Sequence, residues 1–417
     1  MSVVAQAPPT PNTPAARGRQ FFFNPGPTNI PDCVLGAMNR ATVDFFAEDF
    51  LAVQARVHAG IMRTLRTKQH MLMYAANGHG AWEAALVNCF ERGDKLLLIE
   101  SGHFSTHWGM MATELGYTLE TMPSDWRHGV ATEKIEARLK ADGQGTIKGV
   151  MVVHNETATG LVHPLADIRK AIDAAKHPAL LLVDTISSLG SIDVRMDDWG
   201  LDLVVGGSQK GLMMVTGLSF TGISHKALAK SEGIKTPRSY FNWKGMRTMQ
   251  PQRFPGTTPV HLFFGLDEAL RILESEGLDT VLARHHRLAG AVRAAVAHWG
   301  GGAKSGISIG PKGLSGAVKG IELLPADAAR VSDSVSAIMI PDGHDANAMR
   351  KIAIDRYNLS LGGGLGPLAG RVFRIGHLGD LNEPMLLGAL ATVELAMRAA
   401  GVPHQSGGVE AAIGVLG

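Results

Sequence analysis

Residues 180–211 read LLLVDTISSLGSIDVRMDDWGLDLVVGGSQKG and contain two short apolar runs that each lead to a charged residue. The first run, Leu180–Asp184, ends in a carboxylate, and the second, Leu203–Gly206, is followed by Lys210. Short apolar runs bounded by turn residues are typical of strands that are buried on both faces of a parallel sheet. Because the carboxyl ends of parallel strands share one edge of the sheet, this stretch predicts a carboxylate and an amine at one site.

The same pattern continues on both sides of this stretch. Further strands are predicted at residues 96–100, 149–154 and 218–223, and amphipathic helices at residues 81–90, 106–115, 133–141 and 165–175. Strands that alternate with helices predict an α/β fold, with an open, mostly parallel sheet covered by helices on both faces. In such sheets, ligands bind beyond the carboxyl ends of the strands.

The last third of the chain predicts a second, smaller α/β domain. It contains a long helical pattern at 279–299, strand patterns at 336–340 and 372–375, and helical patterns at 347–357 and 383–400. We place the large domain at residues 21–285 and the small C-terminal domain at 286–417, within a boundary range of about 275 to 305. Residues 1–20, rich in Pro, Ala and Thr, are interpreted as a flexible arm, either draped over a partner subunit or plainly disordered.

Composition excludes several classes of protein. The 417 residues are 45% hydrophobic, which is enough for a sizeable core. Lysine plus arginine number 40 and aspartate plus glutamate 38, so the net charge of +2 gives no indication of a nucleic-acid or membrane-surface partner. Cys33 and Cys89 cannot build a disulfide framework or a zinc cluster, and no apolar run is long enough to span a bilayer. We therefore expect a reducing, cytoplasmic environment.

Lys210 follows an apolar run that predicts a buried strand, and this position is unusual because an ammonium group must stay hydrated or be paired. Lys210 is either exposed at the strand end or forms a Schiff base, which removes the charge. Asp184 is either a helix cap or the partner of a protonated pyridine nitrogen in a cofactor. The pair on two neighbouring strands is more specific than either residue alone.

Three more segments place polar or aromatic groups where chains leave strands. Gly78, His79 and Gly80 precede a helix and form either a phosphate site or a plain turn and cap. Thr157, in the polar cluster HNETATG, is either a cofactor contact or part of an ordinary loop. Phe104 either stacks on a flat ring or belongs to the core.

An arginine lies between apolar neighbours in the predicted strand around residue 374. The planar guanidinium of Arg374 suits the α-carboxylate of an amino acid. An internal salt bridge explains the same pattern equally well.

Together these segments resemble the serine–glyoxylate and alanine–glyoxylate aminotransferases, which belong to class V and to fold type I of the pyridoxal-phosphate enzymes. The resemblance runs from residue 24 to residue 379 and so covers most of the chain. The most specific matching segments are HNETATG (154–160), KHPALLLVD (176–184), GSQK (207–210), RYNLSLG (356–362) and FRIGHLG (373–379). It implies a central sheet of the seven-stranded type, together with the smaller C-terminal domain.

The resemblance also implies roles around the cofactor, pyridoxal 5′-phosphate. Lys210 would hold it as a Schiff base and shuttle a proton, and Asp184 would pair with its ring nitrogen. The other implied cofactor contacts are Phe104 on the ring face, Thr157 on the ring side, and Gly78, His79, Gly80 and Gln209 on the phosphate.

The remaining implied roles concern the substrate and a second subunit. Arg374 would bind the substrate carboxylate, with Gly26 nearby. A threonine of the segment FPGTTP, Thr257 by first choice or else Thr258, would reach the phosphate bound by the partner subunit. A shared site implies a homodimer, and further pairing of dimers is left open.

The sequence departs from the family pattern on the substrate side. Where many relatives carry an arginine that reaches across the dimer, residues 43–48 contain Phe45 and Phe46 and no arginine. We expect weaker selection for a second carboxylate, and hence serine or alanine rather than aspartate as the donor and glyoxylate as the acceptor. The alternatives are a pyridoxamine–pyruvate aminotransferase, a lyase, a desulfurase, for which neither cysteine is well placed, and a non-enzymatic binding protein.

Overall fold

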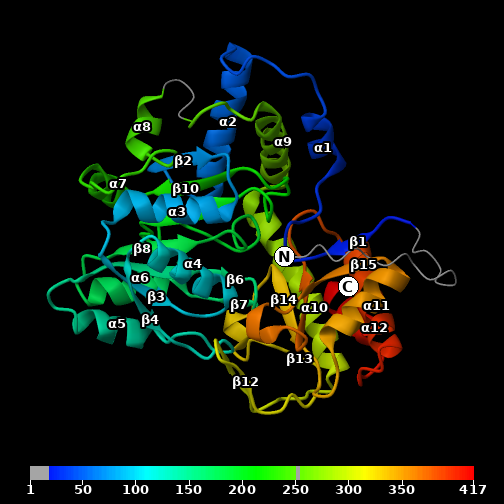
Figure 1. Cartoon of the computed structure of the whole chain (residues 1–417). Helices are drawn as coiled ribbons and strands as arrows, with labels where there is room; N and C mark the ends of the chain where they lie inside the picture. Colours follow the sequence, from blue (N-terminus) through cyan, green and yellow to red (C-terminus); the bar gives the residue numbers. More distant parts are fainter. Residues whose placement is uncertain (1–17, 250–253) are drawn as a thin grey trace.

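The computed structural model describes residues 18–249 and 254–417, and its largest unit is a seven-stranded sheet (Figure 1). In spatial order, the strands are β2 (His70–Tyr74), β10 (Ser219–Ile223), β9 (Leu203–Gly207), β8 (Leu180–Asp184), β5 (Ile147–Val153), β3 (Lys95–Ile99) and β4 (Thr118–Met122). Strand β10 runs antiparallel to both of its neighbours, and the other neighbouring strands pair in parallel. The predicted mostly parallel α/β sheet is confirmed.

Burial explains why the central strands could be predicted from the sequence. All five residues of β8 and of β9 are buried, so both strands carry continuous apolar runs. Strand β4 lies at the edge of the sheet and its residues are all partly or fully exposed. Its sequence therefore carries threonine and glutamate, and no strand was predicted there.

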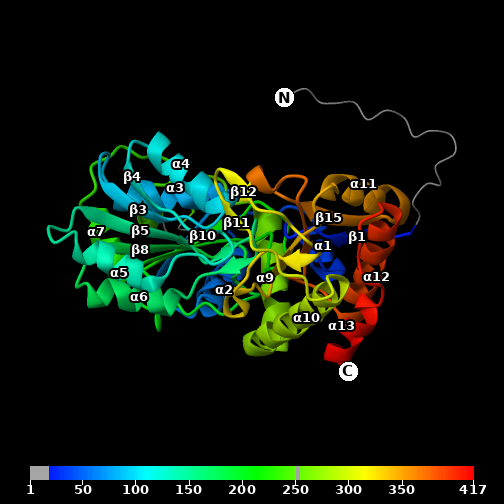
Figure 2. The same ribbon diagram turned by 90° about the horizontal axis from the view of Figure 1, so that it is seen from below.

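Helices cover both faces of this sheet (Figure 2). On one face lie α3 (Gly78–Cys89) and α4 (His103–Glu114), whose buried side chains share one hydrophobic cluster with α7 (His225–Glu232) and α8 (Trp243–Thr248). On the other face lie α5 (Thr132–Lys140) and α6 (Leu165–Ala174), in a cluster with α2 (Glu48–Thr64) and α9 (Val260–Glu276). The two clusters confirm the expected three-layer arrangement.

A second, five-stranded sheet forms the other part of the molecule. Its strands, in spatial order, are β1 (Phe21–Phe23), β15 (Leu359–Gly363), β16 (Val372–Gly376), β14 (Val335–Met339) and β13 (Glu322–Leu323). Four helices share its hydrophobic cluster: α10 (Leu278–Trp299), α11 (Ala346–Tyr357), α12 (Glu383–Ala399) and α13 (Gly408–Leu416). Because β1 pairs with β15, residues near the start of the chain join the C-terminal sheet.

Seven short elements complete the description, and two of the domain predictions stay untested. The short elements are the helix α1 (Asp32–Met38), the strand pair β6 (Asn155–Glu156) and β7 (Leu161–Val162), the strand pair β11 (Ser308–Gly310) and β12 (Gly313–Ser315), and the 3-10 helices η1 (Ala328–Arg330) and η2 (Gly366–Leu368). The predicted boundary at 285 falls inside the unbroken helix α10, so that division remains a prediction. The predicted N-terminal arm lies outside the described residues except for residues 18–20.

The loop after β4 carries a buried arginine that ties the two sheets together. Nη2 of Arg127 donates to Oε2 of Glu322 at 2.9 Å, and its other guanidinium nitrogens donate to the carbonyl oxygens of Leu324 and Ser305. Both side chains of the ion pair are less than a tenth exposed. Arg127 and Glu322 therefore satisfy one another where water cannot replace either partner.

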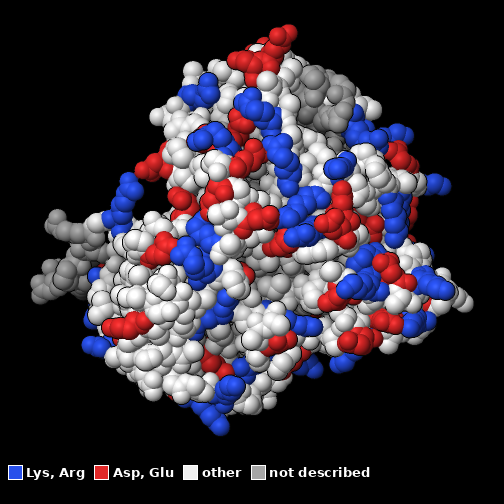
Figure 3. Space-filling view, turned by 180° about the vertical axis from the view of Figure 1, so that it is seen from behind, with Lys and Arg blue, Asp and Glu red and all other residues white. Residues whose placement is uncertain are grey.

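Most other ion pairs lie on the surface. Figure 3 shows lysine and arginine interspersed with aspartate and glutamate over one face of the molecule. An example is Arg56, whose side chain is 58% exposed and whose Nη2 lies 2.6 Å from Oδ2 of Asp267. Within residues 18–249 and 254–417, no helix has the length and apolar character needed to cross a membrane.

Replacing Arg127 with alanine should destabilise the protein strongly. The substitution leaves the carboxylate of Glu322 buried without a cation, which costs about 3–5 kcal/mol. Urea unfolding followed by circular dichroism measures the loss in the free energy of unfolding. The matched control is Arg56→Ala, which breaks an exposed pair worth about 0.2–1 kcal/mol. Equal losses for the two variants would contradict the assignment of Arg127 as the tie between the sheets.

Candidate active site

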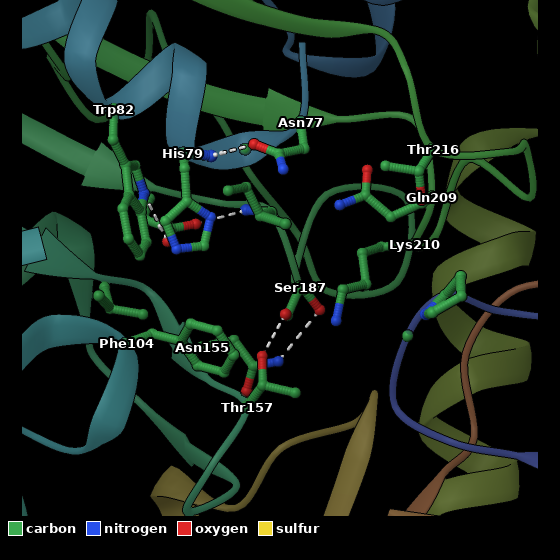
Figure 4. A pocket seen from close by; sticks show the side chains of 16 residues that line it. Asn77, His79, Trp82, Phe104, Asn155, Thr157, Ser187, Gln209, Lys210 and Thr216 are labelled. Atoms are coloured by element: carbon green, nitrogen blue, oxygen red, sulfur yellow. Dashed lines mark hydrogen bonds between the residues drawn. The ribbon is translucent and has the colours of Figure 1, made fainter. Parts of the chain in front are cut away.

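Asp184 and Lys210 are brought to one edge of the large sheet by the pairing of β8 with β9. Asp184 ends β8 and is paired in register with Val205 of β9, and the chain turns after Gly207 toward Lys210. The two side chains are 5% and 8% exposed. Both line one cavity of about 260 Å³, which Figure 4 shows from close by. The expected meeting of these two groups is thus observed.

The Lys210 amine lies deep in the cavity wall. Its Nζ donates to the carbonyl oxygen of Pro25, and a Cβ atom at Gly26 would lie 2.2 Å from that nitrogen. Gly26 also has φ +133°, so both space and backbone conformation require glycine here. Burial, reinforced by the nearby charge of Arg374 and opposed by Asp184, lowers the pKa of Lys210 to about 8. A substantial fraction of the amine is therefore neutral near physiological pH.

The Asp184 carboxylate has two donors and faces the same cavity. Its Oδ1 accepts from the backbone N–H of Ile186 at 2.7 Å, and its Oδ2 accepts from Nε1 of Trp82 at 3.0 Å. Burial raises the pKa of Asp184 to about 7, although both donors and Lys210 act in the opposite direction. A cation bound beside this carboxylate would offset the cost of burying its charge.

One end of the cavity is built from the N-terminus of α3. Asn77 caps this helix, because its Oδ1 accepts from the backbone N–H of His79 at 3.1 Å. A Cβ atom at Gly78 would lie 2.1 Å from Cδ1 of Ile186, so any other residue here would force the Ile186 side chain to shift. Gln209 also lines the cavity, and its buried Oε1 has no hydrogen-bond partner among the described residues. The positive end of the helix dipole suits this end to an anion.

Phe104 and Thr157 line the same cavity (Figure 4). Phe104 lies in the first turn of α4, where the buried carboxylate of Glu156 accepts from the backbone N–H groups of Phe104 and Ser105, each at 3.0 Å. The hydroxyl of Thr157 is hydrogen-bonded to that of Ser187. The segment 154–160 therefore supplies two cavity residues, Asn155 and Thr157, and fixes the helix that supplies Phe104.

Arg374 is buried in β16 beside the cavity. Its Nε donates to the carbonyl oxygen of Gly363 at 2.8 Å, and its Nη1 donates to that of Thr157 at 2.9 Å. Burial lowers the pKa of Arg374 to about 10, with partial compensation by Glu156. In the described part of the chain no carboxylate lies within 4.0 Å of this guanidinium. The internal salt bridge that the sequence left open is therefore not found there.

Several predicted site residues do not line the cavity of this single chain. Gly80 lies in the first turn of α3 and packs against Ala76 and Phe241. Phe45 and Phe46 pack against each other with ring centroids 4.6 Å apart, and Phe46 is 57% exposed. Thr257 is exposed, whereas Thr258 is buried. Their roles across a dimer remain predictions, because one chain is described.

Sequence reasoning also missed cavity residues. They are Pro27, Asn77, Trp82, Val153, Asn155, Ile186, Ser187 and Thr216. Asn77 had a readable signal, since an asparagine directly before a helical pattern is a cap signal. Trp82 had none, because its contact with Asp184 joins residues of different elements that only the tertiary fold brings together.

Comparisons with known proteins agree with this geometry. The family model described as "Aminotransferase class-V" matches residues 20–355. The chain is 43% identical to a serine–glyoxylate aminotransferase of Methylorubrum extorquens over 96% of each chain. It is 41% identical to an L-aspartate–glyoxylate aminotransferase of Paracoccus denitrificans over 94% of each chain. A crystal structure of the pyridoxamine–pyruvate aminotransferase of Mesorhizobium loti superimposes with a TM-score of 0.83 at 27% identity, covering 95% of this chain and 96% of the other.

A family match over most of the chain, relatives above 40% identity and a shared fold type I architecture all point the same way. The chain belongs to the class V aminotransferases.

Proposed function

We propose that the chain is a pyridoxal-phosphate-dependent aminotransferase that moves the amino group of serine or alanine to glyoxylate, giving glycine. The observation that carries the proposal is the burial of Lys210 and Asp184 in one cavity, at the ends of adjacent strands. The names of the relatives, which act with glyoxylate on serine or aspartate, support the acceptor.

The residues present fit a phosphorylated pyridine. Gly78 and Gly26 line the cavity and, because they lack a Cβ atom, let the side chains of Ile186 and Lys210 pack directly against the backbone. Gln209 has a buried Oε1 without a partner among the described residues, so its amide is free to turn toward a ligand. We assign the phosphate to the N-terminus of α3 with Gln209, and the ring face to Phe104.

When bound, pyridoxal phosphate supplies an aldehyde that condenses with amines and a pyridine ring that withdraws electrons from the amino carbon. Asp184 keeps the proton on the ring nitrogen by pairing with it. Lys210, whose buried amine has a lowered pKa, would act as the base for the proton at Cα of the amino acid and as the donor of that proton to C4′. Arg374 orients the substrate by its carboxylate, so that Cα faces Lys210.

We infer the amino donor from the absence of an arginine in residues 43–48 on the substrate side. Residues 43–48 carry Phe45 and Phe46 where many relatives have an arginine, which removes a partner for a second carboxylate. Serine and alanine are therefore favoured over aspartate. Because the chain is also similar to an aspartate–glyoxylate aminotransferase, aspartate is one of the amino donors to be tested.

We infer a homodimer in a reducing cytoplasm. Thr257 is exposed and so is accessible to a cofactor in a partner subunit, and Phe46 is an exposed apolar side chain that a partner subunit could cover. Both cysteines are free, as a reducing compartment requires.

The similarity to a pyridoxamine–pyruvate aminotransferase supports a second candidate function. Pyridoxamine carries no phosphate and would be a substrate that leaves with each turnover. The N-terminus of α3, which ends at the cavity and suits an anion, favours a phosphorylated cofactor instead. A visible spectrum that survives dialysis supports the proposal, whereas loss of all cofactor absorbance favours the second candidate.

The pH dependence of cofactor capture should report the lowered pKa of Lys210. Only the neutral amine attacks the aldehyde, so its fraction rises tenfold per pH unit up to about pH 8 and then levels off. Stopped-flow absorbance of the cofactor-free protein mixed with pyridoxal phosphate, from about pH 6 to about pH 10, measures the rate. A rate that keeps rising to about pH 10.4, as for an ordinary lysine, would contradict the buried amine.

A donor screen with substrate-site variants tests the reaction itself. With glyoxylate as acceptor, we expect kcat/KM to be higher for serine or alanine than for aspartate. Arg374→Gln should lower kcat/KM about 10–150-fold, because charge-assisted hydrogen bonds contribute about 1.5–3 kcal/mol.

The matched control is Arg371→Gln, which removes an arginine next to β16 that pairs with Asp342 on the surface. This control should leave kcat/KM nearly unchanged. Failure of every donor with the cofactor-loaded wild type would refute the proposed reaction, and equal effects of the two variants would refute the role of Arg374.

A further inference from the structure

An indole donates directly to the carboxylate that faces the cavity. Nε1 of Trp82 lies 3.0 Å from Oδ2 of Asp184, and Trp82 is 1% exposed. Trp82 lies in α3, the helix whose N-terminus closes one end of the same cavity (Figure 4). The sequence patterns gave this tryptophan no role.

We propose that Trp82 is a positioning residue that turns the Asp184 carboxylate toward the ring nitrogen of the bound cofactor and keeps it ionised. This inference rests on the proposed function, because it assigns a task to Trp82 in binding the same cofactor. The proposed site thus includes Trp82, which would not touch the cofactor but would orient the Asp184 carboxylate that does.

Packing holds the indole in a fixed orientation. The ring of Trp108 stacks on that of Trp82 at 5.6 Å with an interplanar angle of 16°, and the ring of His79 lies at 4.6 Å. A side chain fixed by rings on two sides cannot turn its N–H to another acceptor without repacking the α3–α4 layer. The direction of the donor is thus set before any ligand binds.

The geometry at Asp184 leaves room for one more partner. An ionised carboxylate has about four acceptor positions on its two oxygens. Trp82 occupies one position on Oδ2 and the backbone N–H of Ile186 occupies one on Oδ1, so each oxygen keeps a free position. Since Asp184 lines the cavity, these positions are available to a protonated ring nitrogen.

The Trp82 indole also contributes to the balance between the protonated and the ionised form of the Asp184 carboxyl group. Burial and the charge of Glu156 favour the protonated form, and Lys210, Ile186 and Trp82 favour the ionised form. Burial outweighs the donors and brings the pKa of Asp184 to about 7, so in the cofactor-free protein the loss of one donor is expected to raise this pKa further and favour the protonated form. A protonated carboxyl group cannot pair with a pyridinium.

The test compares Trp82→Phe with Trp108→Phe. Both substitutions remove a buried indole from the same stack, but Nε1 of Trp108 has no acceptor among the described residues. In cofactor-free protein labelled with ¹³C-aspartate, the Asp184 signal is identified by its absence in Asp184→Asn. Its titration should shift upward by about 1–2 pH units in Trp82→Phe and stay near the wild-type value in Trp108→Phe.

In the loaded enzyme, Trp82→Phe should lower kcat about 10-fold or more, with little change in KM and with its acid limb moved to higher pH. If Trp82→Phe does not fold, replacement of Trp82 by benzothienylalanine removes only the N–H and keeps the ring shape. An Asp184 titration that is unchanged in both Trp82 variants would overturn the inference. Wild-type protein that binds no pyridoxal phosphate would instead overturn the proposed function, and the titration would still measure the Trp82 contact.

Discussion

The parallel pairing of β8 with β9 is the constraint on which the site depends. Register fixes Asp184 opposite Val205, and the turn after Gly207 returns Lys210 to the same edge of the sheet. Two groups of opposite charge are thereby buried within one cavity, where each raises the stability of the other's ionised form. Helix α3 adds a positive end to this cavity, and α4 adds a flat aromatic face, because the sheet determines where both helices begin.

The sequence predicted the parts of the fold that depend on local patterns. The central strands could be predicted because burial on both faces favours continuous apolar runs, such as residues 180–183 of β8. The partly exposed edge strand β4 carries no such run and was missed. Lys210 was found because a lysine near the end of a buried strand is unusual, and Asp184 was found because chain order placed it with Lys210 at the ends of neighbouring strands.

The rest of the site depends on contacts that no local pattern encodes. Glu156 binds the backbone of the first turn of α4 across the sheet edge, and Trp82 reaches Asp184 from a different element. Arg374 was predicted as a carboxylate clamp, yet its carbonyl partners, Gly363 on the neighbouring strand β15 and Thr157 in the segment after β5, follow only from the tertiary fold. Phe45, Phe46 and Thr257 concern a second subunit, which a single chain does not describe.

The central claim is that Lys210 alone bonds the cofactor, because it is the lysine that shares a cavity with Asp184. Borohydride reduction of the protein loaded with pyridoxal phosphate, followed by proteolysis and mass analysis of the labelled peptide, tests it most directly. The account predicts a single phosphopyridoxyl group on the peptide that contains Lys210. A label on another lysine, or no label on protein that absorbs as a loaded enzyme, would contradict it.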